Sequence, residues 1–477
     1  MNYQEPRKMI GDFLFATFVC MLFMFFLVIG TANAQTADCN CDHVIPVGTT
    51  SVNGAGESKD KNDVILILKP GDIICLQSGS YPDLNLKNIV GTTEKPISII
   101  NCGGKVTIGE KPWNHSLYIK DSRYFRLSGT GDQNIERGIF VTAIETREGI
   151  ASSGVVVEGI STDYEIDHIE IADIPFAGIV AKADPKCHLP DYWQRNFVAK
   201  NIKIHDCFIR NTGGEGMYIG YTGGELKCGE EKVFPHNIED LEIYNNHVEN
   251  SGWDGIQVNR VVKGGSIYNN RVYNYGTKDE LYQNTGIYLG WQTSAKLYNN
   301  IIRKGAGMGV EIKGIGDVWV YNNLICDVGF DGIYCNDLDA EVGRSGYCFM
   351  NNTIVNTGRH GIRLENNKSL SSEKNSVDRV YNNILINVKS KRFNNKRDFL
   401  YFAHESDKKI LDVSNNYYAE DLKEAGFTDV ENMNFRLQAT SPLRDKGKNL
   451  YDFGVKTDIE GKERPKGGLY DLGAYQK

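Results

Sequence analysis

Short runs of alternating apolar and polar residues, each ended by Gly or Asn, fill the second half of the chain. One phrase recurs as IYNNHVENSGWDGIQVN from Ile243, LYNNIIRKGAGMGVEIK from Leu297, VYNNLICDVGFDGIYCN from Val320 and FMNNTIVNTGRHGIRLE from Phe349. The shortest full repeat, from one recurrent Gly to the next, is 23 residues. Alternation predicts β-strands, and a period in the low twenties is too short for a pair of helices. The pattern therefore predicts an all-β solenoid, a single-stranded parallel β-helix in which each repeat is one coil.

The paired asparagines stand at the same place in successive repeats. The last Gly stands nine positions after the second Asn in each of the four copies. Asn at one corner of stacked coils satisfies polar groups that a buried turn would leave open. We therefore predict that the pairs point inward as a ladder of amides.

Two stretches at the ends of the solenoid carry a resemblance to known proteins. LKPGDIICLQSGSYPDLNLKNIVGTTEKPISIINCGGKVTIG, from Leu68, resembles the first coils of the chondroitinase B and alginate lyase group. SPLRDKGKNLYDFGVKTDIEGKERPKGGLYDLGAYQK, from Ser441, resembles the tail that closes many β-helices. The resemblance implies a secreted bacterial right-handed parallel β-helix over nearly all of the mature chain.

The first 34 residues read as a secretory signal. Arg7 and Lys8 precede an apolar run from Phe13 to Ile29, and the small residues of Ala32–Ala34 follow it. The run is also long enough to span a bilayer, so an uncleaved membrane anchor is an alternative. We expect a signal peptide over 1–34, a β-helix over 35–420 and a closing segment of the same domain over 421–477, in a secreted, periplasmic or cell-surface protein.

The net charge and the cysteine content indicate which partners and which compartment to expect. The net charge of −8 makes nucleic acid an unexpected partner. Of the 11 cysteines, Cys20 lies in the signal, and the ten that follow permit disulfides in an oxidising compartment. We expect a monomer that binds a polysaccharide, with an acidic one as the first candidate.

Aligning the coils on the recurrent Gly gives every side chain a face, because strand residues alternate. One outward column contains Val180, Tyr218, Gln257, Tyr288, Glu311, Tyr334 and Arg363. The next column contains Lys182, Gly220, Asn259, Gly290, Lys313, Asn336 and Glu365. The residue before each recurrent Gly gives a third column, with Ala177, Glu215, Asp254, Thr285, Met308, Asp331 and His360. Coils spaced by about 4.8 Å match a sugar ring, so this face suits a polysaccharide lying along the axis.

The predicted substrate-binding residues come from these columns and from one loop. They are Tyr218, Gln257, Asn259, Asn336, His360, Asp254 and Trp193. Gly220 and Gly290 favour this interpretation, because a missing side chain leaves room for a ligand. The alternative is that aromatic residues occupy the face only because they pack well on a pleated surface.

Long segments after Lys182 and Gly220 interrupt neighbouring coils at the same edge. Loops of such length in a compact repeat are usually functional. They bring Trp193 towards the face, and they place a cysteine in each loop. We therefore predict a disulfide between Cys187 and Cys228.

Glu311 and Lys313 stand two residues apart in GMGVEIK and allow two interpretations. As a surface ion pair they would contribute little. The resemblance to the chondroitinase B and alginate lyase group implies instead that Glu311 binds Ca²⁺ and that Lys313 is a base. In that group an Arg follows one coil later, whereas here Arg363 is two coils away.

The function predicted from these residues is a polysaccharide lyase that cleaves a uronate-containing polymer by β-elimination. Lys313 would be the base, Tyr288 or Tyr334 the proton donor, and Arg363 or Asn336 the ligand of the carboxylate. The alternatives are a uronate carbon 5 epimerase and a non-catalytic carbohydrate-binding or surface protein. A hydrolytic pair of Asp254 and Asp331 is disfavoured, because three coils separate them by about 14 Å.

Overall fold

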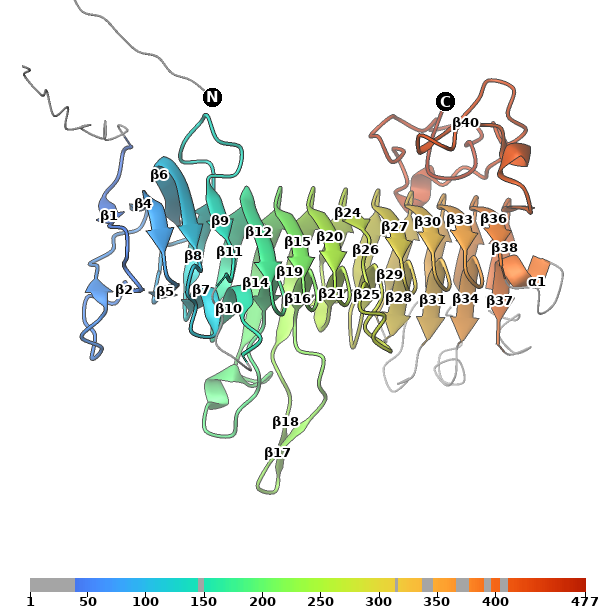
Figure 1. Cartoon of the computed structure of the whole chain (residues 1–477). Coiled ribbons are helices and arrows are strands. Elements are labelled where there is room, and N and C mark those ends of the chain that lie inside the picture. The colour runs from blue at the N-terminus through green and yellow to red at the C-terminus, as the bar shows by residue number, and fades with distance from the viewer. Residues whose placement is uncertain are drawn as a thin grey trace, which may run out of the picture. The chain divides into compact units, whose positions relative to one another are not determined.

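Stacked coils of short parallel strands make up the body of the protein (Figure 1). The computed structural model describes residues 39–144, 150–313, 316–336, 346–365, 377–389, 396–403 and 411–477. The predicted signal segment lies outside these residues. Within them, a typical coil adds one strand to a 13-stranded sheet and two strands to a 24-stranded sheet. The predicted fold class, an all-β parallel β-helix, is confirmed.

The 13-stranded sheet follows one side of the coils. Its strands, in spatial order, are β3 (Val64–Ile65), β2 (Ser51–Asn53), β5 (Leu84–Lys87), β7 (His115–Lys120), β10 (Ser153–Glu158), β13 (Ile179–Ala181), β16 (Met217–Ile219), β21 (Ile256–Val258), β25 (Ile287–Leu289), β28 (Val310–Lys313), β31 (Ile333–Asn336), β34 (Ile362–Glu365) and β37 (Leu400–Phe402).

The 24-stranded sheet forms two further columns. The first contains β1 (His43–Ile45), β4 (Ile73–Tyr81), β6 (Ile97–Ile108), β8 (Arg123–Ser128), β11 (Thr162–Asp167), β14 (Val198–His205), β19 (Asn237–Tyr244), β22 (Val261–Lys263), β23 (Gly265–Tyr268), β26 (Ala295–Tyr298), β29 (Val318–Tyr321), β32 (Cys348–Met350), β35 (Asp378–Tyr381) and β38 (Leu411–Ser414). The second contains β9 (Ile139–Val141), β12 (Ile169–Ile174), β15 (Phe208–Thr212), β20 (His247–Ser251), β24 (Arg271–Tyr273), β27 (Ile301–Gly305), β30 (Leu324–Val328), β33 (Thr353–Thr357), β36 (Ile384–Val388) and β39 (Tyr417–Ala419).

Helices are short in the described ranges. They are η1 (Pro190–Tyr192), α1 (Lys396–Phe399), η4 (Leu422–Ala425) and η5 (Tyr451–Phe453). None of these elements is long and apolar enough to cross a bilayer.

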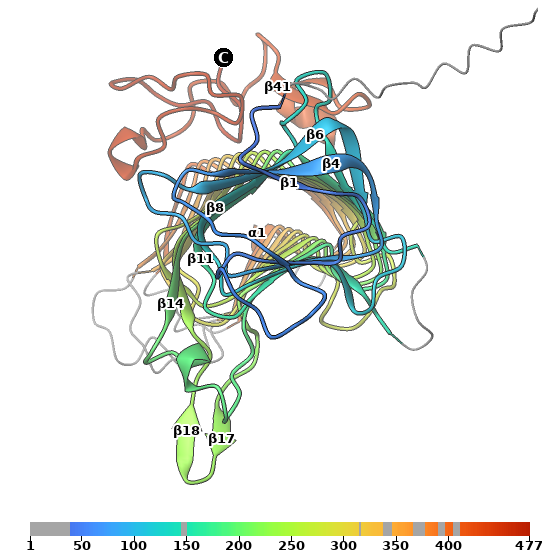
Figure 2. The same cartoon turned by 90° about the vertical axis from the view of Figure 1, so that its left-hand side faces the viewer.

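The core fills the space that the three columns enclose (Figure 2). Alternation sends every second strand residue inward, as Ile256 and Val258 of β21 and Val310 and Ile312 of β28 illustrate, all at most 1% exposed. Each inward residue packs on the same position of the next coil, so that one continuous core grows coil by coil.

An asparagine ladder fixes the corner between the two columns of the 24-stranded sheet. Its members are Asn246, Asn270, Asn300, Asn323, Asn352, Asn383 and Asn416, and each side-chain amide donates to the Oδ1 of the next at 2.9–3.0 Å. The predicted ladder is confirmed for the second Asn of each pair. The first Asn differs: in all seven pairs it has a positive φ, between 53° and 59°, and it does not take part in this inner ladder.

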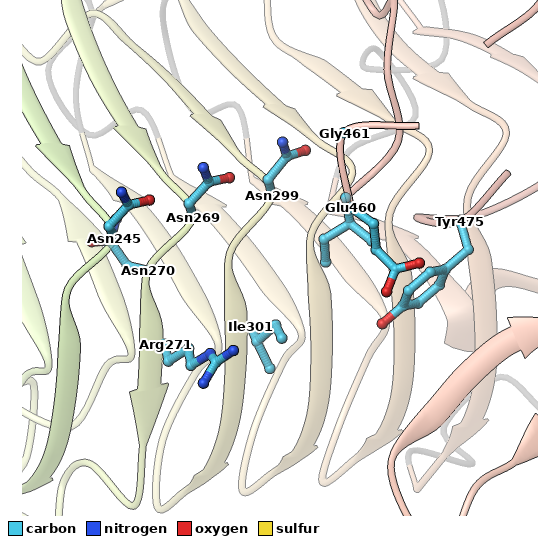
Figure 3. A pocket seen from close by; sticks show the side chains of 10 residues that line it. Asn245, Asn269, Asn270, Arg271, Asn299, Ile301, Glu460, Gly461 and Tyr475 are labelled. Carbon is cyan, nitrogen blue, oxygen red and sulfur yellow. The ribbon is translucent and has the colours of Figure 1, made fainter. Parts of the chain in front are cut away.

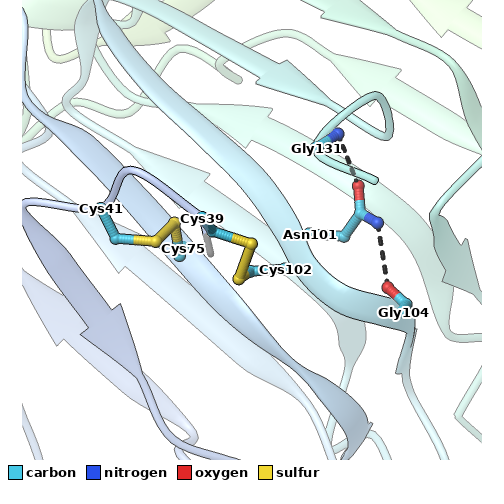
Figure 4. The surroundings of a disulfide bond; sticks show 7 residues. All are labelled: Cys39, Cys41, Cys75, Asn101, Cys102, Gly104 and Gly131. Carbon is cyan, nitrogen blue, oxygen red and sulfur yellow. Dashed lines mark hydrogen bonds between the residues drawn. A yellow bond between two sulfur atoms is a disulfide. The ribbon is translucent and has the colours of Figure 1, made fainter. Parts of the chain in front are cut away.

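Disulfides tie the N-terminal segment to the first coils (Figure 4). Cys39 is bonded to Cys102 and Cys41 to Cys75. Beside them the Asn101 side chain accepts from the Gly131 N–H and donates to the Gly104 carbonyl, both at 2.9 Å. Together with a third disulfide described below, these bonds indicate a protein of an oxidising, extracytoplasmic compartment.

Two irregular segments lie on opposite sides of the coils (Figures 1 and 2). The hairpin of β17 (Leu226–Cys228) and β18 (Glu231–Val233) extends from the side of the 13-stranded sheet. After β39 the tail, with β40 (Phe427–Asp429) and β41 (Asn434–Leu437), folds back along the Asn corner of the last coils. Phe427, Phe435 and Leu443 of the tail pack in one small core with residues of β30, β33 and β36.

Candidate functional site

The outward columns predicted from the repeat exist in the structure. Tyr218 pairs in register with Gln257, and the row continues through Tyr288, Glu311, Tyr334 and Arg363. Lys313 pairs with Asn336, and Asn336 with Glu365. The row extends one coil further than predicted, to Tyr401. The sequence therefore placed these side chains on one face correctly.

Glu311 and Lys313 form a closed ion pair. Lys313 Nζ lies 2.9 Å from Glu311 Oε1, and Thr285 Oγ1 donates to Glu311 Oε2 at 3.0 Å. The pair is not on an open surface, because Glu311 is 1% exposed and the rings of Tyr282 and Tyr288 flank Lys313 at 5.3 and 5.8 Å. In this conformation Lys313 is therefore bonded to Glu311, whereas a catalytic lysine was expected to be free of it. Glu311 is also buried, whereas a surface ion pair was expected to be solvated.

Two acids are buried on adjacent coils, just before β16 and β21, towards the N-terminal end of the face. Glu215 is 2% exposed and Asp254 is 1% exposed. Burial raises the pKa of Glu215 to about 7, and its Oε2 has no hydrogen-bond partner among the described residues. Burial also raises the pKa of Asp254 well above its ordinary value. The hydrogen bond from the Thr285 N–H lowers this pKa, whereas the negative charges of Glu215 and Glu311 raise it further. Asp254 was predicted to bind substrate, whereas Glu215 was placed in the column without a role.

Arg363 belongs to a network at the C-terminal end of the face. Its guanidinium lies 4.8 Å from the ring centroid of Tyr334, and its Nε donates to Glu365 Oε1 at 2.8 Å. The Tyr334 hydroxyl donates to Glu365 Oε2 at 2.8 Å and accepts from the Asn336 amide at 2.7 Å. Burial, and then the bond to Glu365, raise the pKa of Tyr334, so that its phenol holds its proton.

Thr222 covers the amides at the other end of the face. Its hydroxyl accepts from Gln257 at 2.8 Å and from Asn259 at 3.2 Å, and donates to the Tyr218 hydroxyl at 2.9 Å. Gln257 and Asn259 are 4% and 0% exposed. These two predicted sugar ligands are therefore buried beneath the loop that follows β16.

The two glycines of the second column serve packing rather than ligand access. A Cβ on Gly290 would lie 1.9 Å from Asn259 Oδ1, and one on Gly220 would lie 2.1 Å from the Asn259 carbonyl oxygen. Gly220 also has a φ of 72°. The expectation that these glycines leave room for a ligand is wrong, because the neighbouring coil fills the space.

The loops that carry Cys187 and Cys228 are joined as predicted. The two Cα atoms are 5.3 Å apart in a disulfide. Trp193 packs between these loops: it is 7% exposed, and its indole N–H donates to the Lys186 carbonyl at 2.9 Å. It lies within the loop pair and not on the face.

His360 is also enclosed. It is 4% exposed, its Nδ1 contacts the Asp398 carbonyl at 3.0 Å, and its ring stacks on Tyr401 with 4.7 Å between centroids. Further along the face Tyr288, Lys313 and Arg363 are partly exposed, and the buried side chains of Glu311, Tyr334 and Asn336 lie beside them. We call these six residues the central patch. The catalytic roles predicted for its members stay predictions.

A second row of tyrosines runs along the 24-stranded sheet. Tyr244, Tyr268, Tyr298 and Tyr321 stack with centroids 4.9–5.0 Å apart and rings within 6° of parallel. Each ring face is covered by the next ring, so only edges are left for solvent. This row stabilises the stack but offers no flat surface for a sugar, which again favours the central patch.

Ca²⁺ at Glu311 would need several oxygen ligands, typically six to eight. Among the described residues, Glu311 is not in a group of three acidic, His or Cys side chains close enough to share one ion; such groups are Glu165, Asp167 and His205, and the disulfide cysteines Cys39, Cys41 and Cys102. Arg126 already occupies Asp167 in the first group. Ca²⁺ binding at Glu311 stays a prediction, and any further ligands would have to come from carbonyl or amide oxygens or from water.

The comparisons with known proteins concern architecture. A family profile described as a right handed beta helix region matches residues 231–398, which agrees with the predicted hand of the coils. No curated protein sequence matches the chain.

Solved structures of β-helix proteins resemble the chain at low identity. Pectate lyase Pel9A is 12% identical, over 93% of this chain and 99% of that one, with a TM-score of 0.49. A lacto-N-biosidase from Eubacterium ramulus is 14% identical over 80% and 68%, with a TM-score of 0.47. A PL6 family polysaccharide lyase from Pseudopedobacter saltans is 12% identical over 91% and 99%, with a TM-score of 0.43. At these values the chemistry of this chain has to be argued from its own residues.

Proposed function

We propose that the central patch binds an acidic polysaccharide and cleaves it by β-elimination next to a uronate. The observation that carries the proposal is the placing of an amine beside a protonated phenol: Lys313 Nζ lies 5.8 Å from the ring centroid of Tyr288. Burial and the nearby charge of Glu311 raise the pKa of Tyr288, so that its phenol holds a proton to donate. Elimination needs one group that takes a proton and another that gives one.

Lys313 has to be neutral before it can act as a base. The ion pair with Glu311, at 2.9 Å, positions the amine but also holds the proton on it, so the amine becomes available as a base when it leaves this pair and its proton passes to water. Neutral Lys313 then takes the proton from carbon 5 of the uronate, a double bond forms between carbons 4 and 5, the bond from carbon 4 to its glycosidic oxygen breaks, and Tyr288 protonates that oxygen. Transfer of a proton from Lys313 to the tyrosinate then restores both groups.

The uronate carboxylate needs cations and hydrogen-bond donors beside the base. Asn336 is the register partner of Lys313 on the next coil, and Arg363 follows one coil later. A guanidinium binds a carboxylate through two parallel hydrogen bonds. Arg363 would exchange its bond with Glu365 for one with the substrate.

The test is a spectrophotometric assay on polygalacturonate, alginate and chondroitin, because an unsaturated product absorbs in the ultraviolet. Lys313→Ala should abolish this signal, and although the loss of the partner of buried Glu311 lowers stability, far-UV circular dichroism should show that the variant is folded at the assay temperature. Lys296→Ala is the matched control, since this exposed lysine lies on β26 of the other sheet. Turnover that survives Lys313→Ala would refute the assignment of the base.

Two alternatives share this face. A carbon 5 epimerase would abstract the same proton and return one to the opposite side of the ring without breaking the chain, and NMR of the polymer would detect it. A binding protein would retain the polymer without any product.

Glycoside hydrolysis is favoured by one specific observation, the buried pair of Glu215 and Asp254. They stand on adjacent coils, about 4.8 Å apart along the axis, and Glu215 carries a proton near neutral pH because its pKa is about 7. Retaining hydrolases use carboxyl groups separated by roughly 5 Å. New reducing ends without ultraviolet absorbance, lost in Glu215→Gln, would identify this reaction.

A further inference from the structure

The first Asn of each pair forms a row outside the coils, and the tail docks on half of it. The amides of four successive members donate to backbone carbonyl oxygens of the tail at 2.7–3.0 Å, namely Asn322 to Thr457, Asn351 to Asp471 and Gly473, Asn382 to Lys448, and Asn415 to Lys446. Asn382 Oδ1 also accepts from the Lys448 N–H at 2.8 Å. The row thus binds polar chains through both atoms of its amides.

The same row continues uncovered beyond the tail. Asn245, Asn269 and Asn299 have φ values of 56–57°, and their side chains point into a cleft of about 420 Å³ (Figure 3). None of the three amides has a hydrogen-bond partner among the described residues, and Asn299 Oδ1 is itself buried. A buried unpaired oxygen costs free energy unless a ligand or water satisfies it. The cleft is therefore incomplete as it stands.

The rest of the cleft is mixed, because Ile301 and Ile459 line it together with charged side chains and one aromatic ring. Arg271 projects into it from β24, and Glu460 and Tyr475 of the tail border it. Glu460 is neutralised by Arg436, whose Nε donates to it at 2.8 Å. Arg271 is exposed and is the charge available to a ligand.

We propose that this cleft is a second saccharide-binding site, which holds an acidic oligosaccharide and takes no part in the chemistry. Successive amides follow the coils at about 4.8 Å, which matches one sugar ring. An extended peptide rises only about 3.3 Å per residue, and accordingly the tail meets the row with three separate segments rather than one strand. Amides can pair with sugar hydroxyls as donor and acceptor, and Arg271 can bind a uronate carboxylate in a bidentate manner.

The tail that borders this cleft lies on the side of the coils opposite the hairpin (Figures 1 and 2), whereas the central patch belongs to strands of the 13-stranded sheet. The cleft would keep a polymer attached while another stretch of the same polymer is processed. The choice of an acidic ligand rests on the proposed function, whereas the binding itself does not require any reaction.

The test is calorimetric titration in a Lys313→Ala background, so that no ligand is cleaved. The probes are a galacturonate pentamer, a mannuronate pentamer and neutral cellopentaose. Asn269→Gly/Asn299→Gly removes two amides and keeps the positive φ, which Gly tolerates. Asn274→Gly is the control, because Asn274 also has a positive φ (49°) but its amide is bonded to Asn250, away from the cleft.

We expect the double variant to bind one of the uronate pentamers at least tenfold more weakly, or to lose one of two binding sites, with the control unchanged. Arg271→Gln should abolish the preference for that pentamer over cellopentaose. Unchanged binding in the double variant overturns the proposal. The proposal is also overturned if the cleft binds a synthetic peptide of residues 446–457 and binds no saccharide, because that result would identify a peptide site.

The outcome separates this proposal from the proposed function. Cleft variants with otherwise native sequence should keep their turnover of pentamers. Cleft-dependent binding in a protein that cleaves no polyuronate would leave the second site standing and refute the lyase.

Discussion

The Asn ladder allows a stability prediction to be worked out atom by atom. Asn323 is fully buried and has an ordinary φ, so Asn323→Ala introduces no backbone strain. The substitution removes the acceptor of the Asn300 N–H at 3.0 Å and the donor to the Leu297 carbonyl at 2.9 Å. Each buried group left unpaired costs roughly 1–3 kcal/mol. We therefore expect a loss of about 2–6 kcal/mol in the free energy of unfolding.

Urea unfolding followed by far-UV circular dichroism measures this loss, and the end of the ladder provides the control. Asn416 accepts from Asn383 but donates to no further Asn, and it is only half-buried. Asn416→Ala should therefore cost clearly less than Asn323→Ala. Equal losses at the two positions, or a loss below about 0.5 kcal/mol at Asn323, would refute the argument that buried amide pairing holds the corner.

Three further predictions concern the site and its loops. Because burial raises the pKa of Glu215 from 4.5 to about 7, the folded state binds this proton more tightly, and stability should fall by about 3 kcal/mol as pH rises through this range. Glu215→Gln should flatten that slope in urea unfolding, and equal slopes would contradict the burial argument. Replacing Cys187 and Cys228 by Ser should lower the free energy of unfolding by about 2–4 kcal/mol, measured without reductant, and an unchanged midpoint would show that the loops are held by packing alone. Glu311→Gln should weaken turnover. If Ca²⁺ binds at Glu311, added Ca²⁺ should partly restore the turnover of this variant, and a chelator should lower the activity of the wild-type protein. Turnover that responds to neither Ca²⁺ nor the chelator would exclude Ca²⁺ binding.

The fold was predictable from the sequence because the same residue pattern recurs in every coil. Each coil presents the same Gly and the same Asn, and strand alternation then fixes which side chains face inward. The columns through Tyr288, Glu311 and Tyr334 followed from this register alone. The disulfide between Cys187 and Cys228 followed because both loops leave neighbouring coils at one edge.

The environment of the face was not predictable, because segments that do not repeat determine it. Thr222 lies in a loop that occurs once, and its contacts turn Gln257 and Asn259 from surface amides into buried ones. Thr285, which donates to Glu311, stands where other coils have an acid, a His, a Met or an Ala. Docking of the tail on the outer Asn row likewise joins positions that share no pattern, from 31 residues apart for Asn415 and Lys446 to 135 for Asn322 and Thr457.

The two reactions considered for this face place their chemistry at different coils, and that separation makes them distinguishable. Glu215 lies on the coil of β16 and Lys313 on that of β28, three coils or about 14 Å further along the axis. A polymer lying along the axis would cover both, so binding studies alone do not separate them. The protonation states of the two groups do separate them, because elimination needs an amine that has lost its proton, whereas hydrolysis needs a carboxyl group that keeps its proton until the leaving oxygen takes it. Lys313→Ala should therefore stop elimination and spare hydrolysis, Glu215→Gln should do the reverse, and the product formed by each variant identifies which end of the face carries the reaction.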